Sequence, residues 1–196
     1  MFPMSAVPDP NIEQLERLIR GSTWFVEVLN AARDCDPPDW WIGAGVLRDL
    51  VWDELHGGFD PANVKDVDLA FFDTSDLSPD RDAGVEVALQ RRLPTVPWEA
   101  RNQAAVHTWY RRRFGFAVEP LKSSADGVAT WPETATSVAV RLDANDDLQV
   151  TASCGLEDLL NGVCRRNPRR VSVDEYHRRL EAKCVLARWP RIVVVP

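Results

Sequence analysis

The sequence has no long apolar run and few of the side chains that build zinc sites or disulfide frameworks. None of its apolar runs approaches the roughly 18 residues that a membrane-spanning helix needs. Residues 1–11 lack the basic and apolar regions of an export signal. The four cysteines and three histidines are scattered, without a Cys-x-x-Cys pair. We therefore expect a cytoplasmic protein with no membrane partner, no zinc cluster and no disulfide framework.

An excess of basic charge is also absent. The chain has 23 Lys and Arg against 30 Asp and Glu, a formal net charge of −7. This balance disfavours broad contact with the phosphates of duplex nucleic acid and favours a small or locally docked substrate. Two basic runs are exceptions to this acidic balance, namely Arg111 to Arg113 and the four arginines between Arg165 and Arg170. Such runs are most often solvated, but the second leaves contact with a polyphosphate or a nucleic-acid end open.

Length and patterning predict one mixed domain. With 196 residues and 45% hydrophobic residues, the chain is long enough to bury a sizeable core. Helical and strand patterns follow one another without a repeat, which predicts an α+β fold in which helices flank a mixed sheet. We expect a single domain over residues 12–196, preceded by a flexible tail at residues 1–11.

Periodicity and capping signals place the elements of this domain. Helices are expected over 12–33, 45–56, 79–92, 102–113, a short segment after Ser123, 155–161 and 172–188, the last opened by a Ser-x-x-Glu capping box. Strands are expected over 40–42, 64–72, 95–101 and 192–195, together with a hairpin of 137–142 and 148–152.

A glycine-containing turn separates the first strand from the helix that follows it. In Trp40-Trp41-Ile42-Gly43-Ala44-Gly45, the two glycines allow close backbone approach just before a helix N-terminus, where free N–H groups and the helix dipole favour a phosphate. Arg48 lies one turn into that helix. Two readings of Arg48 stay open: a phosphate contact, or a salt bridge with Asp49 or Asp53.

The strand around Val67 carries two carboxylates. Asp66 and Asp68 alternate with apolar residues and therefore project to one face of the strand, with Cα atoms about 6 to 7 Å apart. Two like charges at this spacing favour a cation, and Mg²⁺ accepts one or two carboxylates together with substrate phosphate oxygens. The alternative is that both aspartates face solvent at the start of the strand.

Taken together, these motifs resemble the nucleotidyltransferase superfamily of DNA polymerase β type. Residues 44–49 are similar to the Gly-Gly-x-Val-Arg-Asp motif of the tRNA nucleotidyltransferase branch, with Ala44 in place of the first glycine. The whole run from Trp41 to about Val193 resembles more closely a compact bacterial group of nucleotidyltransferases. Residues 98–104 and 131–136 also carry that resemblance.

The resemblance implies a third carboxylate on a neighbouring strand. Glu99 is the candidate, because it lies on the next extended segment after the Asp-x-Asp strand. Asp53 and Asp73 compete with it but fall in a helix and at a strand exit. A surface position beside Arg101 is the alternative reading of Glu99.

The resemblance also implies an activity, the Mg²⁺-dependent transfer of a nucleotidyl group from an NTP to an acceptor hydroxyl, with release of pyrophosphate. Asp66, Asp68 and Glu99 would hold two Mg²⁺ ions, or Mn²⁺. Gly43, Ala44, Gly45 and Arg48 would bind the nucleotide, with ATP favoured. A small-molecule or protein acceptor is preferred to tRNA. The alternative is a non-catalytic nucleotide- or partner-binding module, antitoxin-like, that keeps the fold.

Overall fold

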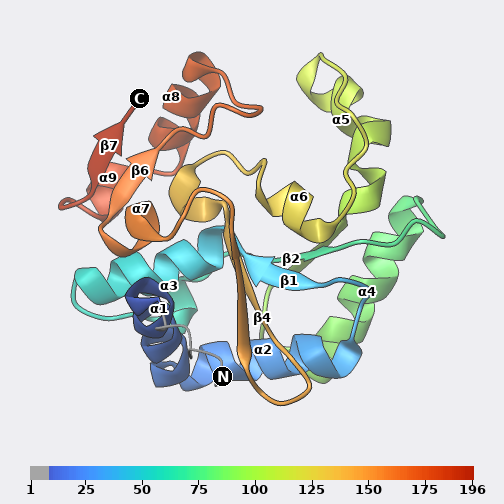
Figure 1. Cartoon of the computed structure of the whole chain (residues 1–196), viewed down its shortest axis with the longest axis horizontal. Helices are drawn as coiled ribbons and strands as arrows, with labels where there is room; N and C mark the ends of the chain where they lie inside the picture. The colour runs from blue at the N-terminus through green and yellow to red at the C-terminus, as the bar shows by residue number, and fades with distance from the viewer. Residues whose placement is uncertain (1–8) are drawn as a thin grey trace, which may run out of the picture.

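A five-stranded mixed sheet in the order β3-β2-β1-β4-β5 organises the fold (Figure 1). The structure is a computed structural model and describes residues 9–196. The strands are β1 (Trp41–Gly43), β2 (Val67–Phe71), β3 (Trp98–Asn102), β4 (Val138–Leu142) and β5 (Leu148–Ala152). The β2 and β3 strands are parallel, and the other neighbours are antiparallel. The parallel pair fits the intervening helix α4, which supplies the crossover connection that parallel strands need.

Helices lie on both faces of this sheet. They are α1 (Pro10–Gly21), α2 (Thr23–Cys35), α3 (Gly45–Leu55), α4 (Pro79–Arg92), α5 (Val106–Phe114), α6 (Ser124–Val128), α7 (Glu157–Leu160), α8 (Val173–Ala182) and α9 (Val185–Arg188). In Figure 1, α2 and α4 lie below the sheet, and α5, α6 and α8 stand above it. Within residues 9–196, no helix is long and apolar enough to span a bilayer.

Strand alternation divides the buried residues between the two faces. Val67, Leu69 and Phe71 of β2 belong to the large core cluster that also includes residues of α2 and α4. The opposite face carries a smaller apolar cluster made of Trp41, Val128, Ala139 and Trp131. The face that α6 partly covers therefore leaves room for polar residues of β2 and β3.

The α+β architecture predicted from the sequence is confirmed, and several boundaries need correction. The helix expected over 12–33 is two helices, because Ser22 is extended and its side chain caps α2. The helix expected over 172–188 is broken at Cys184, whose φ is +49°. Of the expected tail, residues 1–8 lie outside the described residues, and Pro10 already begins α1.

A second, two-stranded sheet was not predicted, although one of its strands was expected over residues 192–195. The β6 strand (Val163–Arg165) pairs in parallel with β7 (Val193–Val195), so the C-terminal segment returns beside α7. The β6 strand is only three residues long, too short for a strand period to show in the sequence. This return carries the residues after Ala182 back toward the main sheet.

Gly43 illustrates how tightly β1 and β4 approach. A Cβ atom at this position would lie 2.2 Å from the Val138 carbonyl oxygen and 2.7 Å from the Ala139 Cβ atom. Both neighbours belong to the strand beside it and cannot move away as a flexible side chain can. Gly43 is therefore required by strand packing, whether or not it also approaches a phosphate.

Gly43→Ala should lower the free energy of unfolding by about 1 to 3 kcal/mol, the usual cost of overpacking a core. Urea denaturation of the wild type and the variant measures this difference. Gly84→Ala is the control, because a Cβ there meets no atom within 4 Å, and alanine in a helix should stabilise by about 0.5 to 1 kcal/mol. Equal stability of Gly43→Ala and wild type would contradict this account of the turn.

Candidate active site

The register of the sheet brings two of the three predicted carboxylates together. Asp68 of β2 is paired with Glu99 of β3 on one side and with Gly43 of β1 on the other. Residues in register on adjacent strands point to the same face, with the strands about 4.8 Å apart. Asp68 and Glu99 therefore share the sheet face that α6 leaves partly open, which we call the carboxylate face. On the other side of Asp68, the backbone of β4 fills the position that a side chain at residue 43 would need.

Asp66 lies just before β2 rather than inside the predicted strand. The strand begins at Val67, so Asp66 is in the segment that leads into it, and it is exposed. Its Oδ1 atom would lie 3.5 Å from a Cβ built on Gly45. The first aspartate thus lies against the Gly-Ala-Gly turn, while the second lies on the sheet. The expectation that both project from one regular strand is corrected in this detail.

Electrostatics single out Asp68 among these groups. Burial, followed by the neighbouring charges of Asp66 and Glu99, raises the pKa of Asp68 to about 6. A half-buried carboxylate with two like charges beside it carries negative charge that a cation would relieve. Across residues 9–196, no group of three or more His, Cys, Asp or Glu side chains is already arranged to hold a metal ion. Asp68 with Asp66 nearby could serve Mg²⁺, because this ion commonly uses one or two carboxylates and takes its remaining ligands from substrate and water.

The turn before α3 departs from ordinary backbone geometry at Ala44. Its φ and ψ are 55° and −124°, a conformation that favours glycine. No side chain caps α3, so the N–H groups of its first turn are not bonded by a cap. Strain of this kind costs about 1 to 3 kcal/mol and is commonly found at functional sites. The turn therefore presents backbone donors beside Asp66.

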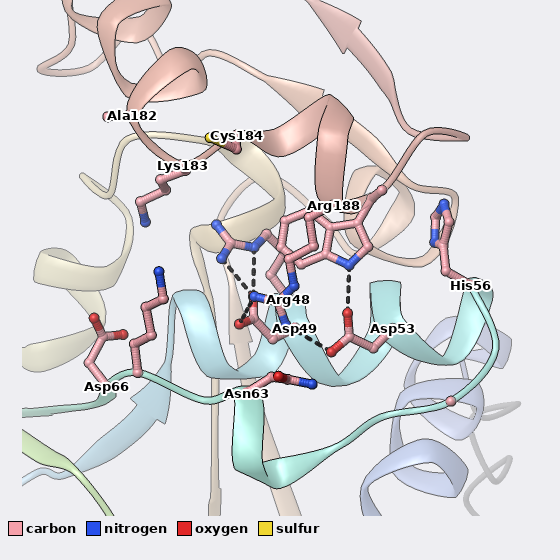
Figure 2. A pocket seen from close by; sticks show the side chains of 13 residues that line it. Arg48, Asp49, Asp53, His56, Asn63, Asp66, Ala182, Lys183, Cys184 and Arg188 are labelled. Carbon is pink, nitrogen blue, oxygen red and sulfur yellow. Dashed lines mark hydrogen bonds and ion pairs between the residues drawn. The ribbon is translucent and has the colours of Figure 1, made fainter.

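Arg48 is buried and held by an ion-pair network (Figure 2). Its Nε and Nη2 atoms donate to Asp49 Oδ1 at 3.0 and 2.6 Å. Its guanidinium carbon lies 4.8 Å from the ring centroid of Trp189. Arg188 bridges Asp49 and Asp53, and the Trp189 indole donates to Asp53 at 2.6 Å. The salt-bridge reading of Arg48 is thus observed, with Asp49 as its partner.

The same network forms one wall of a pocket of about 590 Å³, which we call the basic pocket. Its lining includes Arg48, Lys65, Asp66, Lys183 and Arg188. In Figure 2, Lys183 points across the pocket toward the side on which Asp66 lies. Arg48 Nη2 would be 3.8 Å from a Cβ on Gly45, so its guanidinium also reaches the turn. Asp49 and Asp53 also line this pocket and pair with Arg48 and Arg188, whereas Lys65 and Lys183 have no ion pair among residues 9–196.

Lys183 was not predicted from the sequence. It follows α8, and the parallel pairing of β6 with β7 belongs to the same C-terminal return. Burial, with Arg48 close by, lowers the pKa of Lys183. Lys183 lines the same pocket as Arg48 and Asp66, which lie far from it in the sequence. Such a long-range arrangement leaves no local pattern, so only the tertiary structure identifies this residue.

The two competing carboxylates are already engaged elsewhere. Asp53 accepts from Arg188 and Trp189, as described above. Asp73 is bonded by Ser75 and Arg81, which hold its pKa at about 2. Neither lies beside Asp68, so Glu99 stays the better candidate for a third carboxylate.

Residues 30–194 match a family model described as nucleotidyltransferase. The chain belongs to this nucleotidyltransferase family. A solved structure described as a CCA-adding enzyme head domain is similar to it, with 27% sequence identity and a TM-score of 0.78 over 93% of this chain and 95% of that one. A comparison with curated protein sequences gave no match.

Larger CCA-adding enzymes share the fold. The *Thermotoga maritima* CCA-adding enzyme complexed with tRNA is 17% identical with a TM-score of 0.52, and a CCA-adding enzyme complexed with CTP is 16% identical with a TM-score of 0.52. Each match covers 96% of this chain but only 40% and 41% of those chains. This nucleotidyltransferase chain therefore spans about two fifths of the length of those enzymes.

Asp68→Asn should stabilise this nucleotidyltransferase at pH 8 without metal. The folded pKa of Asp68, about 6, lies above the ordinary aspartate value of 3.8. Its charged form therefore destabilises the fold above pH 6, and this penalty disappears as the pH falls below 4. We expect a gain of about 2 kcal/mol at pH 8 in EDTA and almost none near pH 4.

Urea denaturation at the two pH values measures this effect. Glu119→Gln, which removes an exposed carboxylate, is the control and should leave stability within about 0.5 kcal/mol at both pH values. A loss of stability for Asp68→Asn that is the same at pH 8 and pH 4 would contradict the assigned environment of Asp68.

Proposed function

We propose that the chain transfers a nucleotidyl group from an NTP, with ATP favoured, to an acceptor hydroxyl in a Mg²⁺-dependent reaction that releases pyrophosphate. The observation that carries this proposal is the juxtaposition of Asp68, Glu99 and Gly43 in register across three strands, with Asp66 against the Gly45 turn. Membership of the nucleotidyltransferase family supports the reaction class.

The donor triphosphate is assigned to the basic pocket. The N–H groups of the first turn of α3 offer hydrogen bonds to phosphate oxygens, and the helix dipole favours negative charge there. Lys183, Lys65 and Arg48 add positive charge around the pocket. These groups would hold the β and γ phosphates and stabilise pyrophosphate as it leaves. Asp49 would keep the Arg48 guanidinium in place beside Gly45.

Asp66 and Asp68 are the residues that would hold the metal ions, with Mg²⁺ or Mn²⁺ completed by phosphate oxygens. Bound metal would supply charge neutralisation at the transferring phosphate. The raised pKa of Asp68 fits this assignment, because the carboxylate is poorly compensated by protein groups alone.

Glu99 is assigned to the acceptor side. It lies beside Asp68 in the sheet, and its side chain is about half exposed. There it would orient the acceptor hydroxyl and accept its proton as the oxygen bonds to the α-phosphorus. The bond from the α-phosphorus to the bridging oxygen of the β-phosphate breaks, and pyrophosphate carries away the electron pair.

A small-molecule or protein hydroxyl is the acceptor class that we favour over tRNA. Two neighbours of similar fold are named as CCA-adding enzymes bound to tRNA and to CTP. The 196 residues carry a formal net charge of −7, which disfavours broad contact with RNA phosphates. Some arginines of the basic run at Arg165 to Arg170 also form bonds within the protein. Arg165 pairs with Asp158, and Arg166 donates to the Val171 carbonyl, which leaves fewer charges for an RNA backbone.

Thermal unfolding with each of the four common NTPs, in Mg²⁺ and in EDTA, tests the proposal. An NTP at 100 times its dissociation constant should add about 2.7 kcal/mol of stability. We expect this stabilisation for at least one NTP in Mg²⁺, and its loss in EDTA and in Asp66→Asn and Asp68→Asn. Slow pyrophosphate release from the same NTP, with water as acceptor, should follow the same pattern.

Each variant is compared with its own ligand-free midpoint, because Asp68→Asn is itself expected to be more stable. Glu119→Gln serves as the control and should behave as wild type. No stabilisation by any NTP would overturn the proposal. Stabilisation that survives EDTA and both aspartate substitutions, without pyrophosphate release, would favour the non-catalytic nucleotide-binding module instead.

A further inference from the structure

A second cavity, of about 410 Å³, lies apart from the basic pocket. Its lining comes from α5, the segment after α6, and the start and middle of α8. Five of its lining residues are aromatic, namely Trp109, Tyr110, Phe114, Phe116 and Trp131. We call it the aromatic pocket. Its volume is within the range of small-molecule sites, and aromatic walls favour a planar ring.

Positive charge accompanies these rings. Arg101, Arg170, Arg178 and Arg179 also line the aromatic pocket, against one lining carboxylate, Glu175. Arg178 pairs with Glu175, and Arg179 pairs with Glu133. Arg170 instead has its guanidinium carbon 5.1 Å from the Tyr110 ring centroid, and no ion pair holds it within residues 9–196. The aromatic pocket thus has, among residues 9–196, a cation without an ion-pair partner beside several aromatic rings, which suits an anion attached to a ring.

The aromatic pocket adjoins the carboxylate face. Arg101 is two positions after Glu99 on β3 and therefore points to the same face, with its Nη2 atom 3.7 Å from Glu99 Oε2. Arg179 and Lys183 come from the end of α8, yet one lines the aromatic pocket and the other the basic pocket. Asp66 thus lines the basic pocket, and Arg101, which contacts Glu99, lines the aromatic pocket.

We propose that the aromatic pocket binds the acceptor, and that this acceptor is a small molecule with a planar aromatic ring and an attached anionic group. The inference rests on the proposed function, in which the triphosphate takes the basic pocket and leaves the aromatic pocket to the second substrate. Arg170 binds the anionic group, the rings of α5 and Trp131 contact the planar ring, and Glu99 faces the acceptor hydroxyl from the adjoining sheet face.

Calorimetric titration in EDTA, without NTP, tests the aromatic pocket separately from metal and donor binding. The probes are phenyl phosphate and AMP, which carry a ring and an anion, and ribose 5-phosphate, which has the anion without an aromatic ring. We expect the two aromatic probes to bind at least tenfold more tightly than ribose 5-phosphate. Arg170→Gln should weaken them about tenfold, since a charge-assisted contact is lost.

Arg169→Gln is the matched control, because it removes the same charge from an exposed neighbour outside the aromatic pocket. It should bind the aromatic probes as wild type does. The proposal is overturned if neither aromatic probe binds, if ribose 5-phosphate binds equally well, or if Arg169→Gln weakens binding as much as Arg170→Gln. Binding of a short oligoadenylate but of neither small probe would assign the aromatic pocket to an RNA end instead.

Because these titrations contain no metal and no NTP, their result does not depend on the nucleotide experiment. Failure of the aromatic pocket would leave the NTP-dependent stabilisation intact. Failure of the proposed function would appear as a loss of that stabilisation, with aromatic binding unchanged.

Discussion

Like-charge repulsion at the β2–β3 side of the sheet is the constraint on which the site depends. Asp68 is half-buried between Gly43 and Glu99, and Asp66 lies just before it. An ordinary fold would avoid placing three carboxylates so near one another, because each raises the cost of ionising its neighbours. Gly43 allows β1 and β4 to pack closely beside Asp68, because a side chain at this position would clash with β4. Positively charged groups near Asp66, Asp68 and Glu99 reduce the cost of ionising these three carboxylates.

The C-terminal return supplies one positive charge near these carboxylates, Lys183, and fixes two other carboxylates on α3. Lys183 reaches the basic pocket, while Arg188 and Trp189 fix the carboxylates of α3 through direct hydrogen bonds. A buried ion-pair network is a modest source of stability by itself, but removal of one partner leaves an uncompensated charge. The return therefore connects the packing of residues 183–196 to the position of Arg48, whose guanidinium lies over Trp189.

Local signals in the sequence predicted much of the fold. The α4 helix begins after Ser78, with Pro79 at its first position, and ends at Arg92, as predicted. The hairpin of β4 and β5 flanks its Asn-Asp turn. The helix breaks at Ser22 and Cys184 were missed, because a capping serine and a single residue with positive φ leave the apolar periodicity unbroken. The β6–β7 pair was missed because parallel pairing is non-local.

The candidate site likewise has residues that local sequence signals predicted and residues that only non-local packing brings in. Asp68 and Glu99 were predicted to be neighbours, and the register of β2 and β3 is consistent with that prediction. Lys183 and the aromatic pocket depend on where α8 packs, which no short motif records. Sequence motifs therefore indicate the candidate carboxylates, whereas Lys183 and the aromatic pocket can be identified only from the tertiary packing.

Paramagnetic broadening by Mn²⁺, followed on the backbone amide signals of the unsubstituted protein, tests the central claim most directly. If the carboxylates around Asp68 form the cation site, substoichiometric Mn²⁺ should first broaden the amides of Gly43, Gly45, Asp66 to Asp68 and Glu99. Broadening centred on the exposed acidic turn at Asp143 to Asp147, with the amides around Asp68 unaffected, would contradict it.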